Sequence, residues 1–164
     1  MDKTFKNTDR EFNKHFMPIA IDVKDKKVLL IGGGKVALHK IDSLLQYANR
    51  LEVVAIEVHD EIKKKQLPYK EKPYEESDLE GSVLVYACTN ISELNARIKS
   101  DAAKRNILVN VVDNPAHCDF VSPAIYRNQY ISVAVSSNAK NVYKSVEVRN
   151  KIKELLDNDS TLLD

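Results

Sequence analysis

The chain is poor in several residue types that mark particular classes of protein. Its 164 residues include two cysteines and no tryptophan. A disulfide-stapled scaffold is therefore excluded, and Cys88 and Cys118 lack the paired spacing of a zinc finger. Charge of one sign is also lacking, because 25 Lys and Arg face 24 Asp and Glu. No strong overall field favours nucleic acid or an anionic membrane.

Long apolar runs are missing as well. No stretch reaches the roughly 18 apolar residues of a membrane-spanning helix, and residues 1–18 are too polar for a signal-peptide core. Apolar residues make up 43% of the chain and charged residues 30%, which is typical of a globular domain. We expect a cytoplasmic domain that acts without nucleic acid or membrane.

Glycine is scarce, yet three of the four glycines stand together as Gly32–Gly34. A short apolar run at 27–31 precedes them, and residues 36–48 repeat apolar side chains at helical spacing, which predicts a strand, a turn and a helix. With Ala37 the segment matches G-x-G-x-x-A, the turn that binds a dinucleotide. The first glycine permits the turn, Gly34 lets the backbone approach a pyrophosphate, and the small Ala37 allows close packing.

The pattern continues with strands at 51–56, 82–88 and 107–112 and a helix at 92–105. A short edge strand is also compatible with residues 68–74, although prolines disfavour it. Strands alternating with helices predict an α/β fold, a Rossmann-type parallel sheet with helices on both faces.

The alternation of predicted strands and helices stops after residue 113. Residues 124–135 suggest a hairpin, and apolar spacing predicts a last helix from 142. We therefore assign residues 1–113 to an NAD-binding domain. Residues 114–164 form a small hairpin-plus-helix segment.

The predicted cofactor is NAD. Glu57 ends the second strand, where an acid can bind the ribose hydroxyls of NAD and would repel the 2′-phosphate of NADP. A ligand-free glycine turn and a solvated loop carboxylate remain the alternatives. The expected cofactor-binding residues are those of the three strand ends: Gly32, Gly33, Gly34, Lys35, Val36, Ile56, Glu57, Thr89 and Asn90.

A more specific signal follows the last strand of the sheet. The runs 110–115 (NVVDNP) and 118–125 (CDFVSPAI) resemble the precorrin-2 dehydrogenase family of siroheme biosynthesis, which includes the N-terminal part of siroheme synthases. Further matches occur in the same order at 16–18, 32–37, 39–40, 87–90 and 94–95. The resemblance implies NAD-dependent oxidation of the tetrapyrrole precorrin-2 to sirohydrochlorin by a homodimer. The segment after the sheet then serves dimerisation and substrate binding.

Asp113 is the candidate general base. It directly follows a buried strand at the carboxyl edge of the sheet, where open α/β folds bind ligands. Oxidation of the substrate releases a proton as well as a hydride, so a carboxylate there can accept the proton. A turn-forming aspartate before Asn-Pro is the alternative. The resemblance aligns a catalytic aspartate with this position.

Substrate binding is assigned to Ser137, Arg127 and Lys140. Precorrin-2 carries many carboxylates, which favours cations, and the resemblance places a serine of the family at Ser137. The family usually has a glycine pair followed by Ser-Pro after this strand, whereas this chain has 136–142, SSNAKNV. No metal site is expected, because the adjacent residues of the run 117–119 (HCD) cannot easily point at one ion.

Two other functions remain open. Some members of the family also insert ferrous iron, using further C-terminal helical structure, for which the residues after Lys144 leave little room. We therefore expect dehydrogenation alone, with a bifunctional dehydrogenase and ferrochelatase as one alternative. The other is a non-catalytic nucleotide-sensing Rossmann domain, which would give no reason for the run at 118–125.

Overall fold

The computed structural model describes residues 13–112 and 114–158. Contacts divide them into two compact units. The larger unit comprises residues 20–120 and the smaller one residues 13–19 and 121–158. No helix in the described part of the chain has the length and apolar character needed to cross a bilayer.

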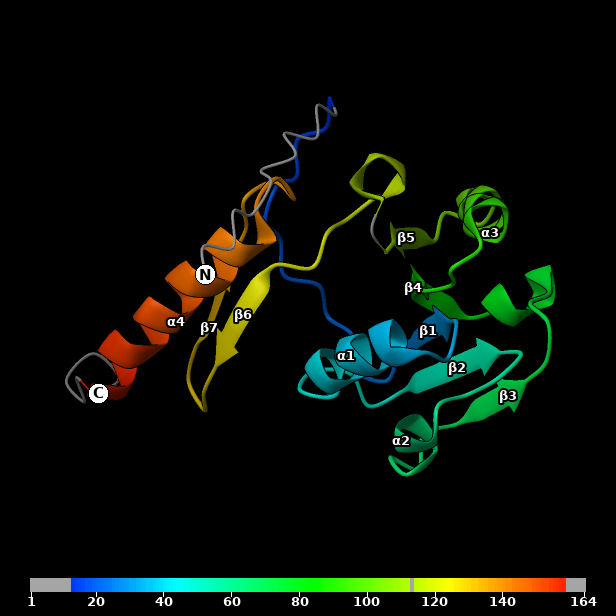
Figure 1. Ribbon diagram of the computed structural model, residues 1–164, viewed down its shortest axis with the longest axis horizontal. Coiled ribbons are helices and arrows are strands. Elements are labelled where there is room, and N and C mark those ends of the chain that lie inside the picture. The colour runs from blue at the N-terminus through cyan, green and yellow to red at the C-terminus, as the bar shows by residue number, and fades with distance from the viewer. Residues whose placement is uncertain (1–12, 113, 159–164) are drawn as a thin grey trace, which may run out of the picture. The chain divides into compact units, whose positions relative to one another are not determined.

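The larger unit alternates strands and helices along the chain (Figure 1). Its elements are β1 (Lys27–Ile31), α1 (Lys35–Leu44), β2 (Leu51–Ala55), α2 (Asp60–Lys63), β3 (Tyr69–Glu71), the 3-10 helix η1 (Glu76–Leu79), β4 (Ser82–Ala87), α3 (Ser92–Ala103), β5 (Leu108–Val111) and the 3-10 helix η2 (Pro115–His117).

All five strands form one parallel sheet in the order β3-β2-β1-β4-β5. β1 lies in the middle, and its apolar run is buried because neighbouring strands and layers cover it on every side. The chain moves outward from β1 to β3, then returns to β4 on the other flank. This confirms the predicted Rossmann-type α/β fold.

The two faces of the sheet carry separate helices. Ala37 and Ile41 of α1 pack in one apolar cluster with Val28 and Leu30 of β1. Successive strand residues point to opposite faces, so the buried Leu29 faces the other way. α3 contacts β4 and β5, and right-handed crossovers place it opposite α1, because the chain runs in opposite directions across the sheet.

Some elements differ from the sequence-based expectation. The edge strand expected near 68–74 forms as β3, since an edge position tolerates neighbouring prolines. α2 was not predicted, because four residues are too few to display a helical period. α1 ends at Leu44 rather than at residue 48, and a turn follows.

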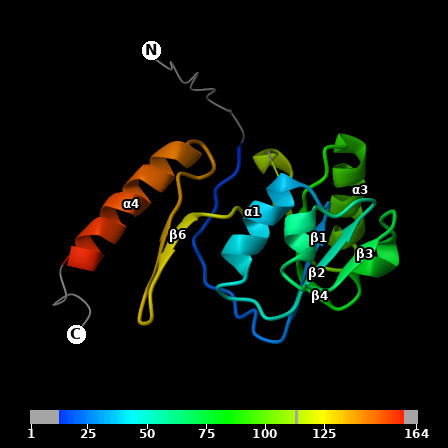
Figure 2. The same cartoon turned by 60° about the horizontal axis from the view of Figure 1, so that its bottom comes forward.

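The smaller unit contains the antiparallel strands β6 (Ala124–Arg127) and β7 (Ser132–Val135) and the helix α4 (Val142–Asn158). α4 packs along both strands (Figure 2). The side chain of Asn138 joins the N-terminal residues to this unit, because it accepts from Phe16 N (2.7 Å) and donates to Lys14 O (2.7 Å).

By contacts the larger unit extends to Phe120, whereas the sequence-based assignment divides the chain after residue 113. The physical reason is that residues 118–120 hydrogen-bond to β5 and so belong to the larger unit. The point at which predicted strands and helices stop alternating does not reveal such contacts.

Candidate functional site

The turn between β1 and α1 has a backbone that only glycine adopts easily at its first position. Gly32 has a φ of +112°, and a β-carbon there would lie 2.6 Å from the carbonyl oxygen of Cys88. The turn is thus held directly against the end of β4. A larger residue at position 32 would separate the two.

Gly33 is constrained by the loop that follows β2. A β-carbon on Gly33 would lie 2.4 Å from Glu57 O and 3.0 Å from the β-carbon of Ala55. The carbonyl of Gly33 also accepts the backbone N–H of His59 at 2.8 Å. The glycine turn therefore contacts the loops after both strands that flank β1.

Gly34 presents the open face of the turn. A β-carbon there would have no neighbour within 4 Å, and no side chain caps the helix that begins after it. The first N–H groups of a helix lack partners within the helix and attract anions. Lys35 and Val36 are exposed, while Ala37 is fully buried against the sheet. This arrangement suits the approach of a phosphate group.

The loop after β2 carries two exposed candidates, Ile56 and Glu57. The next residue, Val58, is buried, and its N–H donates to Glu71 Oε1 at 3.1 Å. Lys63 Nζ lies 2.8 Å from the same oxygen. The hydrogen bond from Lys63 and, to a smaller extent, the one from Val58 N–H hold the pKa of the Glu71 carboxyl below its usual value. Glu71 thereby fixes the loop that presents Glu57.

Thr89 and Asn90 follow β4. The Thr89 hydroxyl donates to Asn95 Oδ1 (2.7 Å), and Asn95 Nδ2 donates back to Thr89 O (3.0 Å). This pair fixes the start of α3. The Thr89 side chain is therefore engaged within the loop, and Asn90 is the exposed residue of the two.

These loops meet at one edge of the sheet. The chain passes from β1 to β2 on one flank and from β1 to β4 on the other. Open α/β sheets bind ligands in the crevice outside the carboxyl ends of strands where the strand order reverses. The glycine turn, Glu57 and Asn90 all follow these strands, so the structure brings the expected cofactor residues to one place.

Asp113 lies outside the described residues. The described residues on either side are anchored: Val112 N donates to Ala87 O (3.0 Å), and Asn114 N donates to Val111 O (3.1 Å). The backbone flanking Asp113 in sequence thus remains attached to the carboxyl end of the sheet.

The three substrate candidates belong to the smaller unit but not to one cluster. Arg127 pairs with Ser132 at the turn end of the hairpin. Ser137 and Lys140 follow β7, beyond the opposite end, where Ala124 pairs with Val135. Within one chain, Arg127 therefore lies at the opposite end of the hairpin from Ser137 and Lys140.

The loop after β7 reproduces a glycine-like backbone without glycine. Asn138 and Ala139 have φ values of 55° and 60°. Asparagine tolerates this left-handed region better than most residues. Ser137 Oγ accepts from Asn141 N at 2.9 Å, and Asn141 Oδ1 accepts from Lys144 N at 2.8 Å. The loop is therefore ordered around the start of α4 although the glycine pair is missing.

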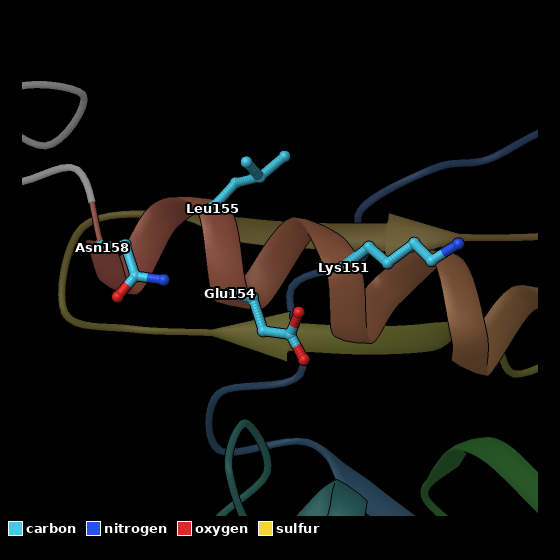
Figure 3. A pocket seen from close by; sticks show the side chains of 4 residues that line it. All are labelled: Lys151, Glu154, Leu155 and Asn158. Carbon is cyan, nitrogen blue, oxygen red and sulfur yellow. The ribbon is translucent and has the colours of Figure 1, made fainter.

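A hollow on the surface of α4 is a less suitable site. It is lined only by the side chains Lys151, Glu154, Leu155 and Asn158 of that helix (Figure 3). None of these is among the predicted site residues. Within residues 13–112 and 114–158, no three His, Cys, Asp or Glu side chains gather in a way that could hold a metal ion.

Sequence reasoning missed three residues that support the loops. Glu71 fixes the loop after β2, and Cys118 and Asp119 bond to β5. No local pattern in the sequence indicates these roles, since each partner lies 7 to 13 positions away along the chain.

Comparison with known proteins identifies relatives of this arrangement. The chain is 37% identical over 145 residues to the siroheme synthase of Photorhabdus laumondii. The aligned region covers 86% of this chain and 31% of that protein. It is 39% identical over 142 residues to the siroheme synthase of Ectopseudomonas mendocina, covering 84% of this chain and 30% of the relative. The chain thus spans less than a third of the length of these relatives.

A solved structure titled "SirC, precorrin-2 dehydrogenase" matches with a TM-score of 0.74 and 26% sequence identity, over 85% of this chain and 70% of that one. The resemblance predicted from the runs at 110–115 and 118–125 is thereby confirmed. Residues 19–124 match the family profile described as "Putative NAD(P)-binding". They include the whole parallel sheet, and the chain belongs to this NAD(P)-binding family.

Proposed function

We propose that this chain uses NAD to oxidise precorrin-2 to sirohydrochlorin in siroheme biosynthesis. The observation that carries the proposal is the open face of Gly34 at the uncapped start of α1, between the loops after β2 and β4. The named activities of the relatives and of the structural neighbour supply the substrate.

The residues present fit a dinucleotide. Gly34 leaves free space beside unpaired N–H groups, as a pyrophosphate requires. When bound, NAD supplies an acceptor for the hydride that leaves the substrate. Glu57 is exposed beside the turn and binds ribose hydroxyls, and its charge disfavours a 2′-phosphate. NAD is therefore the proposed cofactor rather than NADP.

Asp113 is the proposed base. Oxidation removes two hydrogens from the substrate. One leaves as a hydride, which carries both electrons, and the other leaves as a proton. The carboxylate of Asp113 accepts the proton, since position 113 comes directly after β5 and Val112 in the sequence and open α/β sheets bind ligands at the carboxyl ends of their strands. Ser137, Lys140 and Arg127 are proposed to bind the substrate carboxylates.

We also propose a homodimer built on the smaller unit. This unit exposes large apolar side chains: Tyr130 is 70% exposed, Val142 65%, Tyr143 74% and Leu155 67%. Among the described residues the sheet of this unit has two strands, and the edge of a small sheet is a place where a second copy of a chain can pair. A two-fold pairing covers such surfaces. It also offers a way to bring Arg127 of one protomer toward Ser137 of its partner.

The test is an anaerobic assay with precorrin-2 and NAD, followed by absorbance. Formation of NADH and sirohydrochlorin in equal amounts is the expected result. Binding of NAD without turnover would instead favour a nucleotide-sensing domain. Absence of nucleotide binding would reject both.

A further inference from the structure

The side chain of Asn138 joins two segments that lie far apart in the sequence. Its Oδ1 accepts the backbone N–H of Phe16 at 2.7 Å, and its Nδ2 donates to the carbonyl of Lys14 at 2.7 Å. Along an extended chain, the C=O of one residue and the N–H of the residue two positions later point to the same side, so one amide group reaches both. The Asn138 amide therefore holds residues 14–16 as the backbone of a neighbouring strand would.

The turn that contains Asn138 does not need these bonds. It runs from Ser137 to Lys140 and is closed by its own backbone, because Lys140 N donates to Ser137 O at 3.1 Å. Its two central residues, Asn138 and Ala139, have φ values of 55° and 60°, as a type I′ turn requires. The amide of Asn138 is thus engaged with the N-terminal residues and not with the closure of its own turn.

The two joined segments have the same chemical character. Residues 13–17 and 136–144 include three lysines and one histidine and no acidic residue. Glu147, the first acidic residue after this stretch, pairs with Lys144 at 3.1 Å. Met17 is 79% exposed. Cations beside exposed apolar groups suit a large ring that carries carboxylates at its rim, which describes a tetrapyrrole such as precorrin-2.

We infer that residues 14–17 form one side of the substrate site, next to the loop of Ser137 and Lys140, and that Asn138 is the positioning residue that holds them there. The inference rests on the proposed role of that loop in binding the substrate. Asn138 acts through the backbone of the N-terminal residues, and Lys14 adds a cation to those of the loop. Both segments belong to the smaller unit.

The first experiment compares substrate binding with turnover. Asn138→Gly preserves the turn, because glycine adopts a positive φ easily, and it removes both hydrogen bonds. It should raise the KM for precorrin-2 and the Kd of the product sirohydrochlorin about tenfold, as the loss of two hydrogen bonds implies. A uniform loss of binding leaves kcat unchanged. The Kd of NAD should also stay within about twofold of wild type, because the proposed nucleotide residues lie in the larger unit.

Asn49→Gly is the matched control. The amide of Asn49 also makes two hydrogen bonds, since it accepts from Asp25 N (2.9 Å) and donates to Asp25 Oδ1 (2.7 Å), in the larger unit. The same substitution there should lower the melting temperature and leave the KM for precorrin-2 unchanged. An equal rise of KM in both variants would indicate a general loss of stability and would overturn the inference.

A second substitution tests whether the effect passes through the N-terminal residues. Lys14→Met removes the cation, while the backbone carbonyl of this residue still accepts from Asn138. In the wild-type background it should raise KM about tenfold, the usual effect of losing a hydrogen bond to a charged group. In the Asn138→Gly background the further rise should stay below about twofold, because the segment is no longer held beside the substrate. Full additivity would overturn the role of Asn138.

Trypsin supplies a readout that is independent of turnover. Sirohydrochlorin should slow cleavage after Lys14 in the wild type, as followed by mass spectrometry, and cleavage without ligand should be faster in Asn138→Gly. The wild-type comparison needs no variant, so it holds even if Asn138→Gly does not fold. Cleavage that sirohydrochlorin leaves unchanged would overturn the placement of residues 14–17 at the substrate site.

The outcomes separate this inference from the proposed function. A wild type that neither forms NADH nor binds sirohydrochlorin overturns both. Turnover of precorrin-2 with the same KM in wild type and Asn138→Gly overturns only the inference. Binding of sirohydrochlorin that protects Lys14, without NADH formation, would reject the proposed oxidation and still support the inference.

Discussion

A β-carbon placed on Gly33 would lie 2.4 Å from the carbonyl oxygen of Glu57. The glycine turn and the loop after β2 are therefore in backbone contact, which the hydrogen bond from His59 N to Gly33 O (2.8 Å) reinforces. The middle glycine of the triplet is needed for packing, whereas Gly34 faces open space. Three adjacent glycines thus have different physical roles.

Gly33→Ala should destabilise the protein, because the new methyl group overlaps the backbone of Glu57. Overpacking of this kind typically costs about 1–3 kcal/mol in the free energy of unfolding. Urea denaturation measures the change. Gly34→Ala is the matched control and should stay within about 0.5 kcal/mol of wild type, since nothing lies within 4 Å of its β-carbon. Equal stability of the two variants would contradict the packing argument.

Gly34→Val should abolish nucleotide binding in a folded protein. The side chain would project into the open face where the pyrophosphate approaches the start of α1. Calorimetric titration with NAD and NADP measures the loss, and an unchanged melting temperature shows that the fold is intact. Unaltered affinity in this variant would mean that the turn is not the nucleotide site.

The wild type should bind NAD more tightly than NADP. Glu57→Gln should reduce the ratio of the two affinities by about tenfold or more. A hydrogen bond to a charged group contributes about 1.5–3 kcal/mol, and about 1.4 kcal/mol corresponds to tenfold in affinity. Glu61→Gln removes a nearby exposed carboxylate on α2 and serves as the control for net charge. Equal wild-type affinities for the two nucleotides would refute the role of Glu57.

Asp113→Asn should lower kcat for NADH formation by about 10²–10⁴, the usual contribution of a general base. Because the amide differs little in size from the carboxylate, the Kd of NAD should not change. Stopped-flow absorbance and calorimetry measure the two quantities separately. A variant with nearly wild-type turnover would assign the proton to another group.

Light scattering of the wild type at micromolar concentration should give about twice the chain mass of 18.6 kDa. The double variant Tyr143→Ser/Leu155→Ser removes two of the exposed apolar side chains of α4 and should shift the equilibrium toward the monomer. A stable wild-type monomer would exclude the proposed dimer. A variant as dimeric as wild type would exclude α4 from the interface.

The local order of elements could be predicted from the sequence, because its signals lie within a few residues of one another. The apolar run at 27–31, the glycine triplet and the helical spacing after it predict β1, the turn and α1 without knowledge of the rest of the chain. The same holds for the parallel sheet, whose alternating strands and helices allow few topologies. The runs at 110–115 and 118–125 likewise indicated the family.

Only the tertiary structure decided which residues support the site. Gly33 meets Glu57, and Cys118 bonds to Val111, because the sheet brings distant backbone segments within a few ångströms. The hairpin register places Arg127 at the turn end of the hairpin and Ser137 beyond the opposite end, although the two residues are close together in the sequence. Periodicity reports which face of an element is buried, but it carries no information about which partner meets it there. That choice follows from the packing of the whole chain, and so it is visible only in the folded structure.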